Sequence, residues 1–462
     1  MNKLTIIVTY YNAEEYITGC LESIKQQRTQ DFNLIIVNDG STDQSKKLMD
    51  EAIKDYDKNI RFIDLDENSG HAHARNIALE EVETPYFMFL DADDELASYA
   101  ITFYLEKFNN TDGLIAPIHS FTTQRPQFVD LDRVRVEYFN AKENINSFLR
   151  KQSACNIIFR TAIVRAHHIR FNENLNTYVD WSFVLEYMKY VNKFVRIFNF
   201  PFYFRGEVYD PFETLTLSEQ NFDILFKDYV NSFYDAIKRA TNPKVREFIV
   251  TKMGNKIANE FEPTRYDINE RYQTHKDTLV ELSKFLHVHL VKNQKLINKI
   301  ETILLMNNET DKAFKVNQFR KTLRHVKNIV LRRKNKERSL YDLTDKEDNV
   351  KPKTIVFESF GGKNYSDSPK YIYEYMQKYY PNYRYIWSFK NPDKNVVPGS
   401  AEKVKRNSAE YYQAYSEASH WVSNARTPLY LNKKENQTYI QTWHGTPLKR
   451  LANDMKVVRM PG

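Results

Sequence analysis

Asp91 and Asp93 stand two residues apart at the end of an apolar run, Tyr86–Leu90. Two carboxylates at that spacing, on the end of a rigid strand, can share a divalent cation such as Mg²⁺ or Mn²⁺. The cation can then hold a diphosphate, which neither carboxylate could hold alone. An exposed acidic turn is the alternative for so short a motif, so the surrounding sequence has to decide.

A second candidate lies in the run YIQTWHGTPLKRL, residues 439–451. Its histidine, His444, follows a β-like lead-in and precedes two cations, Lys449 and Arg450. A neutral histidine beside bound phosphate suits a general base. A single histidine in a turn is also commonly structural, so this motif alone leaves both interpretations open.

A glycine-containing segment upstream belongs to the same candidate. Gly361 and Gly362 follow the apolar run Thr354–Phe357, and glycine lets the backbone approach a ligand closely. Lys363 and Ser366 come directly after them and are side chains that can bind phosphate. The carboxyl-terminal part of the chain is therefore expected to contact a phosphate group.

The elements that must position these residues alternate between strand and helix. Apolar β runs are expected at 4–8, 34–37, 61–65 and 86–90, with helices at 14–27 and 72–81. Such alternation predicts a parallel α/β sheet, which binds ligands in the loops at the carboxyl ends of its strands. Helical periodicity dominates from 219 to 338, and a second α/β unit opens at 354.

Composition excludes several classes of protein. Hydrophobic residues make up 42% of the 462 residues, which is enough for two or three packed domains. The two cysteines, Cys20 and Cys155, form no metal-binding or disulfide pattern. No stretch reaches the roughly 18 apolar residues that span a bilayer, and the first residues predict a buried strand rather than a signal peptide. These features indicate a protein of the cytosol or of a membrane surface.

The net charge of +7 is unevenly distributed, because residues 312–338 hold eleven lysines and arginines against one acid, Glu337. The apolar residues of this segment recur on one helix face and basic residues flank it: Phe319, Leu323, Val326 and Val330, with Arg320, Lys321, Arg324 and Lys327. Such a helix either lies on an anionic membrane surface or packs on its domain with a solvated basic face. No nucleic-acid recognition motif accompanies the charges, so nucleic acid is not expected as a partner.

The motifs of the first hundred residues closely resemble those of the family-2 (GT-A) glycosyltransferases. They are VTYYNAE from Val8, VNDGSTD from Val37, NSG from Asn68 with ARN from Ala74, and LDADD from Leu90. The resemblance covers about residues 1–220 and implies a GT-A nucleotide-diphosphosugar fold. Thr9 stands where the family usually has proline. No Gln-x-x-Arg-Trp element follows, which disfavours the processive polysaccharide synthases.

This resemblance implies roles for individual residues. A nucleotide sugar, expected to be UDP-linked, would be bound by Tyr11, Asn12, Asp39, Arg75 and Asp91. Asp91 and Asp93 would flank Mg²⁺ or Mn²⁺ on the diphosphate. Asp180 occupies the position of the family's base, where it could take the proton of the acceptor hydroxyl. Val179 replaces the glutamate expected there, so an inactive domain kept for docking is the alternative to active transfer.

The carboxyl-terminal motifs look like those of the CDP-glycerol glycerophosphotransferases that build or prime wall teichoic acid. They are FESFGGKNYS from Phe357, PKYIYEY from Pro369, WVSN from Trp421 and QTWHGTPLK from Gln441. The resemblance implies that His444 deprotonates a glycerol hydroxyl of a lipid-linked acceptor, and that Lys363, Ser366 and Lys449 bind acceptor or phosphate. The family is monotopic in the membrane. It normally continues into a second half that binds CDP-glycerol, and we expect that half to be missing here.

Together these patterns predict an α/β enzyme of cell-wall teichoic acid synthesis, peripheral on the cytoplasmic face of the cell membrane. Its parts are a GT-A glycosyltransferase domain at 1–220, a helical, basic, membrane-surface section at 221–340, a linker at 341–352, and the Rossmann-like acceptor half of a GT-B glycerophosphotransferase at 353–462. CDP-glycerol is expected as a partner only when the second half is present. In the alternative, the amino-terminal part is an inactive docking module of a glycerophosphate polymerase.

Overall fold

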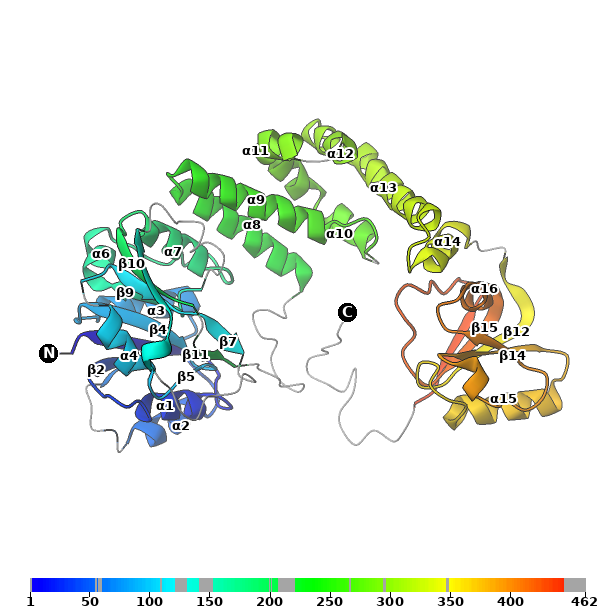
Figure 1. Ribbon diagram of the computed structural model, residues 1–462, viewed down its shortest axis with the longest axis horizontal. Coiled ribbons are helices and arrows are strands. Elements are labelled where there is room, and N and C mark those ends of the chain that lie inside the picture. Colours follow the sequence, from blue (N-terminus) through cyan, green and yellow to red (C-terminus); the bar gives the residue numbers. More distant parts are fainter. Residues whose placement is uncertain are drawn as a thin grey trace. The chain divides into compact units, whose positions relative to one another are not determined.

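The computed structural model places most of the chain in two compact units, one up to Asn255 and one from Lys256 (Figure 1). The residues described are 2–54, 56, 60–108, 110–120, 131–140, 153–198, 200, 202–206, 221–265, 267–293, 296–345 and 349–443. The boundary between the units falls within helix α9 (Pro243–Glu260). The domain limits predicted from the sequence remain our proposal.

The first unit is built on an eight-stranded sheet with the order β3-β2-β1-β4-β9-β6-β10-β8. Its strands are β1 (Leu4–Tyr10), β2 (Phe32–Asn38), β3 (Ile60–Asp64), β4 (Tyr86–Asp91), β6 (Gly113–Ile115), β8 (Val136–Asn140), β9 (Ile157–Arg160) and β10 (Lys193–Ile197). The first four strands run parallel, as predicted. β9 runs antiparallel between β4 and β6, so the sheet is mixed rather than parallel throughout.

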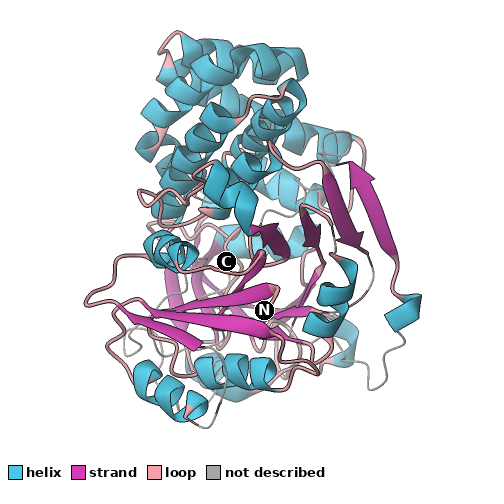
Figure 2. Cartoon of the chain, turned by 90° about the vertical axis from the view of Figure 1, so that its left-hand side faces the viewer, coloured by secondary structure: helices cyan, strands magenta, loops and turns pink. Residues whose placement is uncertain are grey.

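Helices pack on both sides of this sheet (Figure 2). The helices of this part are α1 (Ile17–Lys25), α2 (Ser45–Ile53), α3 (His71–Glu80), α4 (Ala100–Lys107), α6 (Thr161–Ala166) and α7 (Asp180–Met188), and α8 (Phe222–Arg239) packs on α7. Every residue of β1 is buried, because a central parallel strand is covered on both faces and needs an unbroken apolar run. A second, three-stranded sheet has the order β5 (Glu95–Leu96), β11 (Tyr203–Arg205), β7 (Ile118–Ser120).

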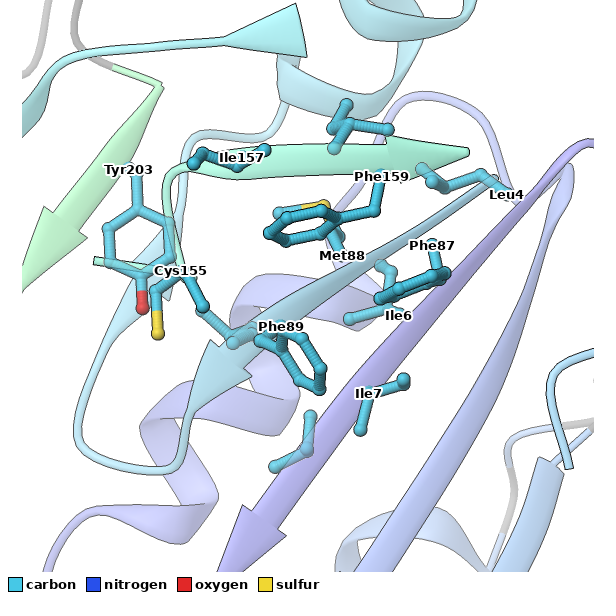
Figure 3. Close-up of a cluster of buried hydrophobic side chains, with 14 of the residues drawn as sticks. Leu4, Ile6, Ile7, Phe87, Met88, Phe89, Cys155, Ile157, Phe159 and Tyr203 are labelled. Carbon is cyan, nitrogen blue, oxygen red and sulfur yellow. The ribbon is translucent and has the colours of Figure 1, made fainter. Parts of the chain in front are cut away.

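Aromatic side chains lock β4 into the core (Figure 3). The Phe87 ring stacks on Phe159 of β9, with 5.3 Å between the ring centroids. On the same strand, Phe89 lies edge-on to Phe171, 5.4 Å away. Both β4 residues are at most 1% exposed, so the strand cannot shift without opening the core. The acidic loop that follows β4 therefore starts from a fixed point.

The second unit contains a helical part and an α/β part. Its helices are α10 (Ile268–Thr274), α11 (Lys276–Asn293), α12 (Leu296–Met306), α13 (Thr310–Val330), α14 (Lys336–Thr344), α15 (Asp367–Tyr379) and α16 (Ala409–Glu417). Five parallel strands form a sheet in the order β14 (Glu402–Lys405), β13 (Arg384–Phe389), β12 (Lys351–Glu358), β15 (Ala418–Ser423), β16 (Thr438–Gln441). This is the Rossmann-like half that the sequence predicts.

Regular elements occupy both ends of the segment 341–352, which the sequence analysis expects to be a linker. Helix α14 continues to Thr344, and β12 already begins at Lys351. Tyr341 is 4% exposed and its ring stacks on Tyr412 of α16, 5.3 Å away. The Tyr341 hydroxyl also accepts a 3.3 Å hydrogen bond from the backbone N–H of Asn432, and Asp345, just after α14, pairs with Lys434 at 2.8 Å. These contacts hold α14 on the α/β part.

Helix α13 carries the predicted apolar face on its surface. Phe319 is 55% exposed, Leu323 and Val326 are each 43% exposed, and Val330 is 71% exposed. In the described part of the chain, no helix is both long enough and apolar enough to cross a membrane.

Candidate active site

Three aspartates lie together where β4 ends. Carboxylate oxygens of Asp91, Asp93 and Asp94 lie within 4.8 Å of one another. Asp94 is buried and accepts hydrogen bonds from the Tyr203 hydroxyl and, at 2.8 Å, from the backbone N–H of Gly206. These two contacts tie the acidic loop to strand β11.

Crowding of the three carboxylates changes their protonation. Burial, and then the charge of Asp91, raises the pKa of Asp93 to about 6. Burial together with both neighbouring aspartates raises the pKa of Asp94 to about 8. A cation among these oxygens would relieve the repulsion that raises both pKa values.

Arg75 on α3 is the cation that the fold itself places beside Asp91. Its side chain is 1% exposed and donates hydrogen bonds of 2.7 Å to Asp91 Oδ1 and 2.7 Å to Asp180 Oδ1. The guanidinium also lies 4.8 Å from the centroid of the Phe89 ring. Burial alone would raise the pKa of Asp91, but the charge of Arg75, with that of His71, lowers it to about 2.

Cys155, just before β9, completes this network. Its sulfur lies 3.2 Å from Asp91 Oδ2 and 3.2 Å from Arg75 Nη2. Burial raises the pKa of the thiol, so it remains protonated and can donate to the carboxylate. Each oxygen of Asp91 therefore has a donor within the protein.

The loops after β1 and β2 form the neighbouring part of the same sheet edge. Asp39 is buried and accepts hydrogen bonds from the backbone N–H groups of Ser69, at 2.8 Å, and Gly70, at 3.0 Å. Gly40, beside it, has φ +66°, and a Cβ there would lie 2.4 Å from the backbone of Glu67. Asp39 thus joins the loop after β2 to the start of α3.

Tyr11 and Asn12 follow β1 on the adjacent loop. Asn12 has φ +47°, and its Oδ1 accepts a hydrogen bond of 2.9 Å from the backbone N–H of Thr42. Its own backbone N–H donates to the Ser41 hydroxyl at 3.0 Å. The Tyr11 side chain is 44% exposed, so its ring borders the loops without being held in the core.

Asp180, the predicted base, is the first residue of α7. Its Oδ2 accepts a hydrogen bond of 2.9 Å from the backbone N–H of Ala154, while Oδ1 accepts from Arg75. A carboxylate offers about four acceptor positions, and the Asp180 side chain is 19% exposed. The Asp180 carboxylate can therefore accept one more hydrogen bond, as from an acceptor hydroxyl. Val179, where a glutamate was expected, is 4% exposed and packs in the core.

The donor set at the end of β4 fits Mg²⁺ or Mn²⁺. Both are hard cations that prefer carboxylate oxygens. Burial, and then repulsion between the aspartates, raises the pKa values of Asp93 and Asp94, and a cation at this cluster would favour their charged forms. Asp91 and Asp93, the two ligands expected from the sequence, lie in this cluster, and Asp94 is a third candidate.

The structure links three of the predicted residues directly, since Arg75 bridges Asp91 and Asp180. Two contributors were missed by the sequence reasoning. Cys155 gave no signal, because a lone cysteine matches no motif and contacts Arg75 across 80 residues of sequence. Tyr203 gave none either, because it reaches Asp94 from a three-residue strand 109 residues away.

The second predicted site lies at the carboxyl edge of the five-stranded sheet. Phe360, Gly361 and Gly362 have φ values of +47°, +60° and +77°, so the chain turns sharply after β12. The backbone N–H of Phe360 donates a 2.7 Å hydrogen bond to the side chain of Asn424, which follows β15. The loop therefore lies between β12 and β15, where the strand order reverses and α/β sheets bind ligands.

Lys363 and Ser366 share this loop. Lys363 is exposed, and Ser366 precedes α15, its hydroxyl donating a 2.9 Å hydrogen bond to Asn364 Oδ1. Beneath them, Glu358 is 1% exposed and accepts a 2.7 Å hydrogen bond from the Ser388 hydroxyl. Burial raises the pKa of Glu358. His444 and Lys449 lie outside the described residues.

Two family models match the chain, each over one of these sites. The model of glycosyl transferase family 2 matches residues 5–169, which include the aspartate cluster and Arg75. The model of CDP-glycerol:poly(glycerophosphate) glycerophosphotransferase matches residues 340–461. The chain joins a family-2 glycosyltransferase domain to a glycerophosphotransferase domain.

Similar proteins agree with both domains. A teichoic acid poly(glycerol phosphate) polymerase of Bacillus subtilis (strain 168) is 47% identical over 118 residues, which are 24% of this chain and 15% of the relative. A structure of S. aureus TarS 1–349 in complex with UDP-GlcNAc is 18% identical with a TM-score of 0.53, and covers 68% of this chain and 90% of that chain. The fold class predicted from the sequence is thereby confirmed.

A structure of the wall teichoic acid polymerase TagF, an H444N variant with CDPG, is 99% identical in the matched part. The match covers 32% of this chain and 36% of that chain, with a TM-score of 0.30. The chain spans less than a third of the length of the first curated relatives that it matches.

Proposed function

We propose that the glycosyltransferase domain transfers a sugar from a UDP-linked donor to a hydroxyl acceptor during cell-wall teichoic acid synthesis. One observation carries this proposal: Asp39, Arg75, Asp91, Asp93 and Asp180 all lie at one edge of the large sheet, three of them joined by hydrogen bonds. The UDP-GlcNAc complex of the similar TarS fold supports the choice of nucleotide.

Each residue has a distinct task in this proposal. Asp39 contacts the base or ribose, and Tyr11 and Asn12 border the nucleotide. Asp91 and Asp93 would hold Mg²⁺ or Mn²⁺, which neutralises charge on the diphosphate leaving group. Asp180 takes the proton of the acceptor hydroxyl as that oxygen bonds to the anomeric carbon. The bond from that carbon to the phosphate oxygen breaks, and UDP leaves with the electron pair.

We propose a second activity for the glycerophosphotransferase domain, supported by the polymerase that it resembles. The domain would bind a lipid-linked acceptor, with Lys363, Ser366 and Lys449 around the phosphate and His444 as base for the glycerol hydroxyl. CDP-glycerol would supply the glycerol phosphate, bound by the second half that the family carries. The turn at Gly361 and Gly362 is the feature of the described residues that supports this placement.

We also propose that α13 lies on an anionic membrane surface, since its apolar side chains are exposed. Two of its predicted lipid-binding cations are engaged within the unit: Arg320 pairs with Glu301 of α12, and Arg324 pairs with Glu262. Lys327 is exposed on the same helix and Lys334 lies just beyond it. These two lysines are the better candidates for lipid contact.

Vesicle co-sedimentation tests the membrane proposal. Replacing Lys327 and Lys334 by glutamine should weaken binding to anionic vesicles at low salt by about 1 kcal/mol for each lysine. Lys47 and Lys54 are exposed lysines of the other unit, and replacing both by glutamine makes the same change in charge. If both double variants sediment alike, α13 is not the lipid-binding element.

Release of UDP from UDP-sugars tests the glycosyltransferase proposal. We expect slow, Mn²⁺-dependent hydrolysis of at least one UDP-sugar by the full chain, and its loss in Asp93→Asn. The competing function is an inactive docking module, favoured by Val179 and by the ion pair that Arg75 makes with Asp180. A chain that binds UDP but hydrolyses no UDP-sugar under any metal condition would support docking instead.

A further inference from the structure

Tyr178 holds a backbone conformation that a bulky side chain rarely adopts. Its φ is +58°, in the left-handed region, where residues other than glycine and asparagine are strained. Strained non-glycine residues persist only where surrounding contacts enforce them, and they concentrate at functional sites. The left-handed conformation of Tyr178 therefore makes this turn a candidate functional feature.

Helix α8 enforces this conformation. The Ser232 hydroxyl donates a 2.9 Å hydrogen bond to the carbonyl of Tyr178. Buried Asp228, also on α8, accepts hydrogen bonds from the backbone N–H of Thr177, at 3.2 Å, and from its hydroxyl, at 3.0 Å. Two residues of one helix thus hold both sides of the turn. These residues lie beyond position 169, where the match to the glycosyltransferase family model ends.

A second aromatic residue of helix α8 packs against the ring of Tyr178. Tyr229 is 8% exposed and meets the Tyr178 ring edge-on at 5.0 Å, with Trp181 packed on Tyr229 at 5.4 Å. Tyr178 itself is 37% exposed. An exposed ring on a buried aromatic base presents a rigid apolar surface with a hydroxyl at its edge.

Tyr178 lies two residues before the proposed base, Asp180, in the chain. Consecutive Cα atoms are 3.8 Å apart, so the Cα atoms of Tyr178 and Asp180 lie within about 7.6 Å. Apart from Arg75 on α3, the predicted donor-binding residues lie at the ends of β1, β2 and β4 or in the loops that follow, whereas Tyr178 precedes α7. The ring thus belongs to a different element from those that would hold the nucleotide.

We infer that Tyr178 is the acceptor platform of the glycosyltransferase site, against which a sugar or polyol acceptor packs while its hydroxyl approaches Asp180. The inference rests on the proposed glycosyl transfer. The aliphatic C–H groups of either acceptor would contact the exposed ring. The left-handed turn at Tyr178 is held by Ser232 and Asp228, so the ring keeps one position relative to α8.

Saturation-transfer NMR on the full chain tests this inference, with and without UDP and Mn²⁺. The probes are a poly(glycerol phosphate) oligomer and methyl N-acetylglucosaminide, which separate a polyol acceptor from a sugar acceptor. Tyr178→Phe keeps the ring and should bind the preferred probe within twofold of the parent. Tyr178→Asn keeps the left-handed backbone but removes the ring, and should weaken that probe at least tenfold.

Tyr138 provides the matched control, because it is a 61% exposed tyrosine of the same unit on β8. Tyr138→Asn should leave probe binding unchanged, and thermal unfolding should show that both asparagine variants are folded. Binding of neither probe to the parent, or equal losses in Tyr178→Asn and Tyr138→Asn, would overturn the inference. UDP affinity, measured on the same samples, reports separately on the proposed glycosyl transfer.

Discussion

The two sheets share a strand order and differ in the charge at their carboxyl edges. β3-β2-β1-β4 and β14-β13-β12-β15 both place four parallel strands in the order three, two, one, four. The first edge presents aspartates, among them Asp39, Asp91 and Asp93. The second presents Lys363, Lys390 and Arg406, which follow the ends of its strands.

This difference decides which phosphate chemistry each edge can support. An acidic edge repels a diphosphate and needs a metal ion between the two. A basic edge can bind phosphate directly. Each edge also contains a buried ionisable side chain of the opposite kind: Arg75, paired with Asp91, and Glu358, whose Oε2 lies 3.5 Å from Arg406 Nε. The shared strand order places loops at both edges. The charge of the residues in those loops sets how each edge could bind a phosphate group.

Removing the two buried charges should give the largest contrast. Arg75→Met leaves Asp91 and Asp180 without their cation and should lower the free energy of unfolding by about 3 kcal/mol. Glu358→Gln should cost under about 1 kcal/mol, since burial already favours the neutral carboxyl and glutamine keeps its shape. Urea unfolding of the full chain measures both.

Arg61→Met serves as a control for that comparison, because the Arg61–Glu81 pair is largely exposed and should contribute under about 1 kcal/mol. If Arg75→Met and Glu358→Gln lower the free energy of unfolding equally, the two buried side chains contribute equally to stability, against this expectation.

Glycine substitutions probe the turns at the two edges. A Cβ on Gly40, which has φ +66°, would meet the backbone of Glu67 at 2.4 Å, so Gly40→Ala should cost about 2–3 kcal/mol. Gly361 has φ +60° but its nearest neighbour, Arg406 Nη1, would be 3.7 Å away. Gly361→Ala should therefore cost only about 1 kcal/mol of backbone strain. Thermal unfolding measures both losses of stability. A larger loss in Gly361→Ala than in Gly40→Ala would show that the turn at the acidic edge tolerates a side chain better than the turn at the basic edge.

Lys363 tests the basic edge with the smallest expected effect. Lys363→Gln should weaken binding of glycerol 3-phosphate to the full chain about tenfold, the loss of one charge-assisted hydrogen bond. EDTA should make no difference to that affinity in the parent. Lys378→Gln, an exposed lysine of α15, is the control. Equal effects of the two substitutions, measured by NMR titration, would argue against a specific site on this loop.

The sequence predicted those parts of both sites that are local in the chain. Asp91 and Asp93 follow one apolar strand, and the turn at Gly361 and Gly362 follows another, so short-range patterns were sufficient. The link from Arg75 to Asp180 spans 105 residues and depends on how α3 and α7 pack. The spacing of residues along the sequence does not predict tertiary contacts of this kind.

Misassignments had the same physical origin. The four-residue strand β9 pairs antiparallel with β4, and Phe159 of β9 stacks on Phe87. No local sequence pattern predicts this antiparallel strand. The polar stretch around Tyr341 looked like a linker until that ring was found stacked on Tyr412. In both places an aromatic contact between distant segments outweighed local composition.

We propose that the acidic edge binds a nucleotide only through a divalent cation. Calorimetric titration of UDP into the full chain, with Mn²⁺ and then with EDTA, measures this dependence. We predict an affinity at least about tenfold higher with Mn²⁺, and loss of that gain in Asp93→Asn with the fold intact. Equal UDP affinity of the parent with and without metal would contradict the account.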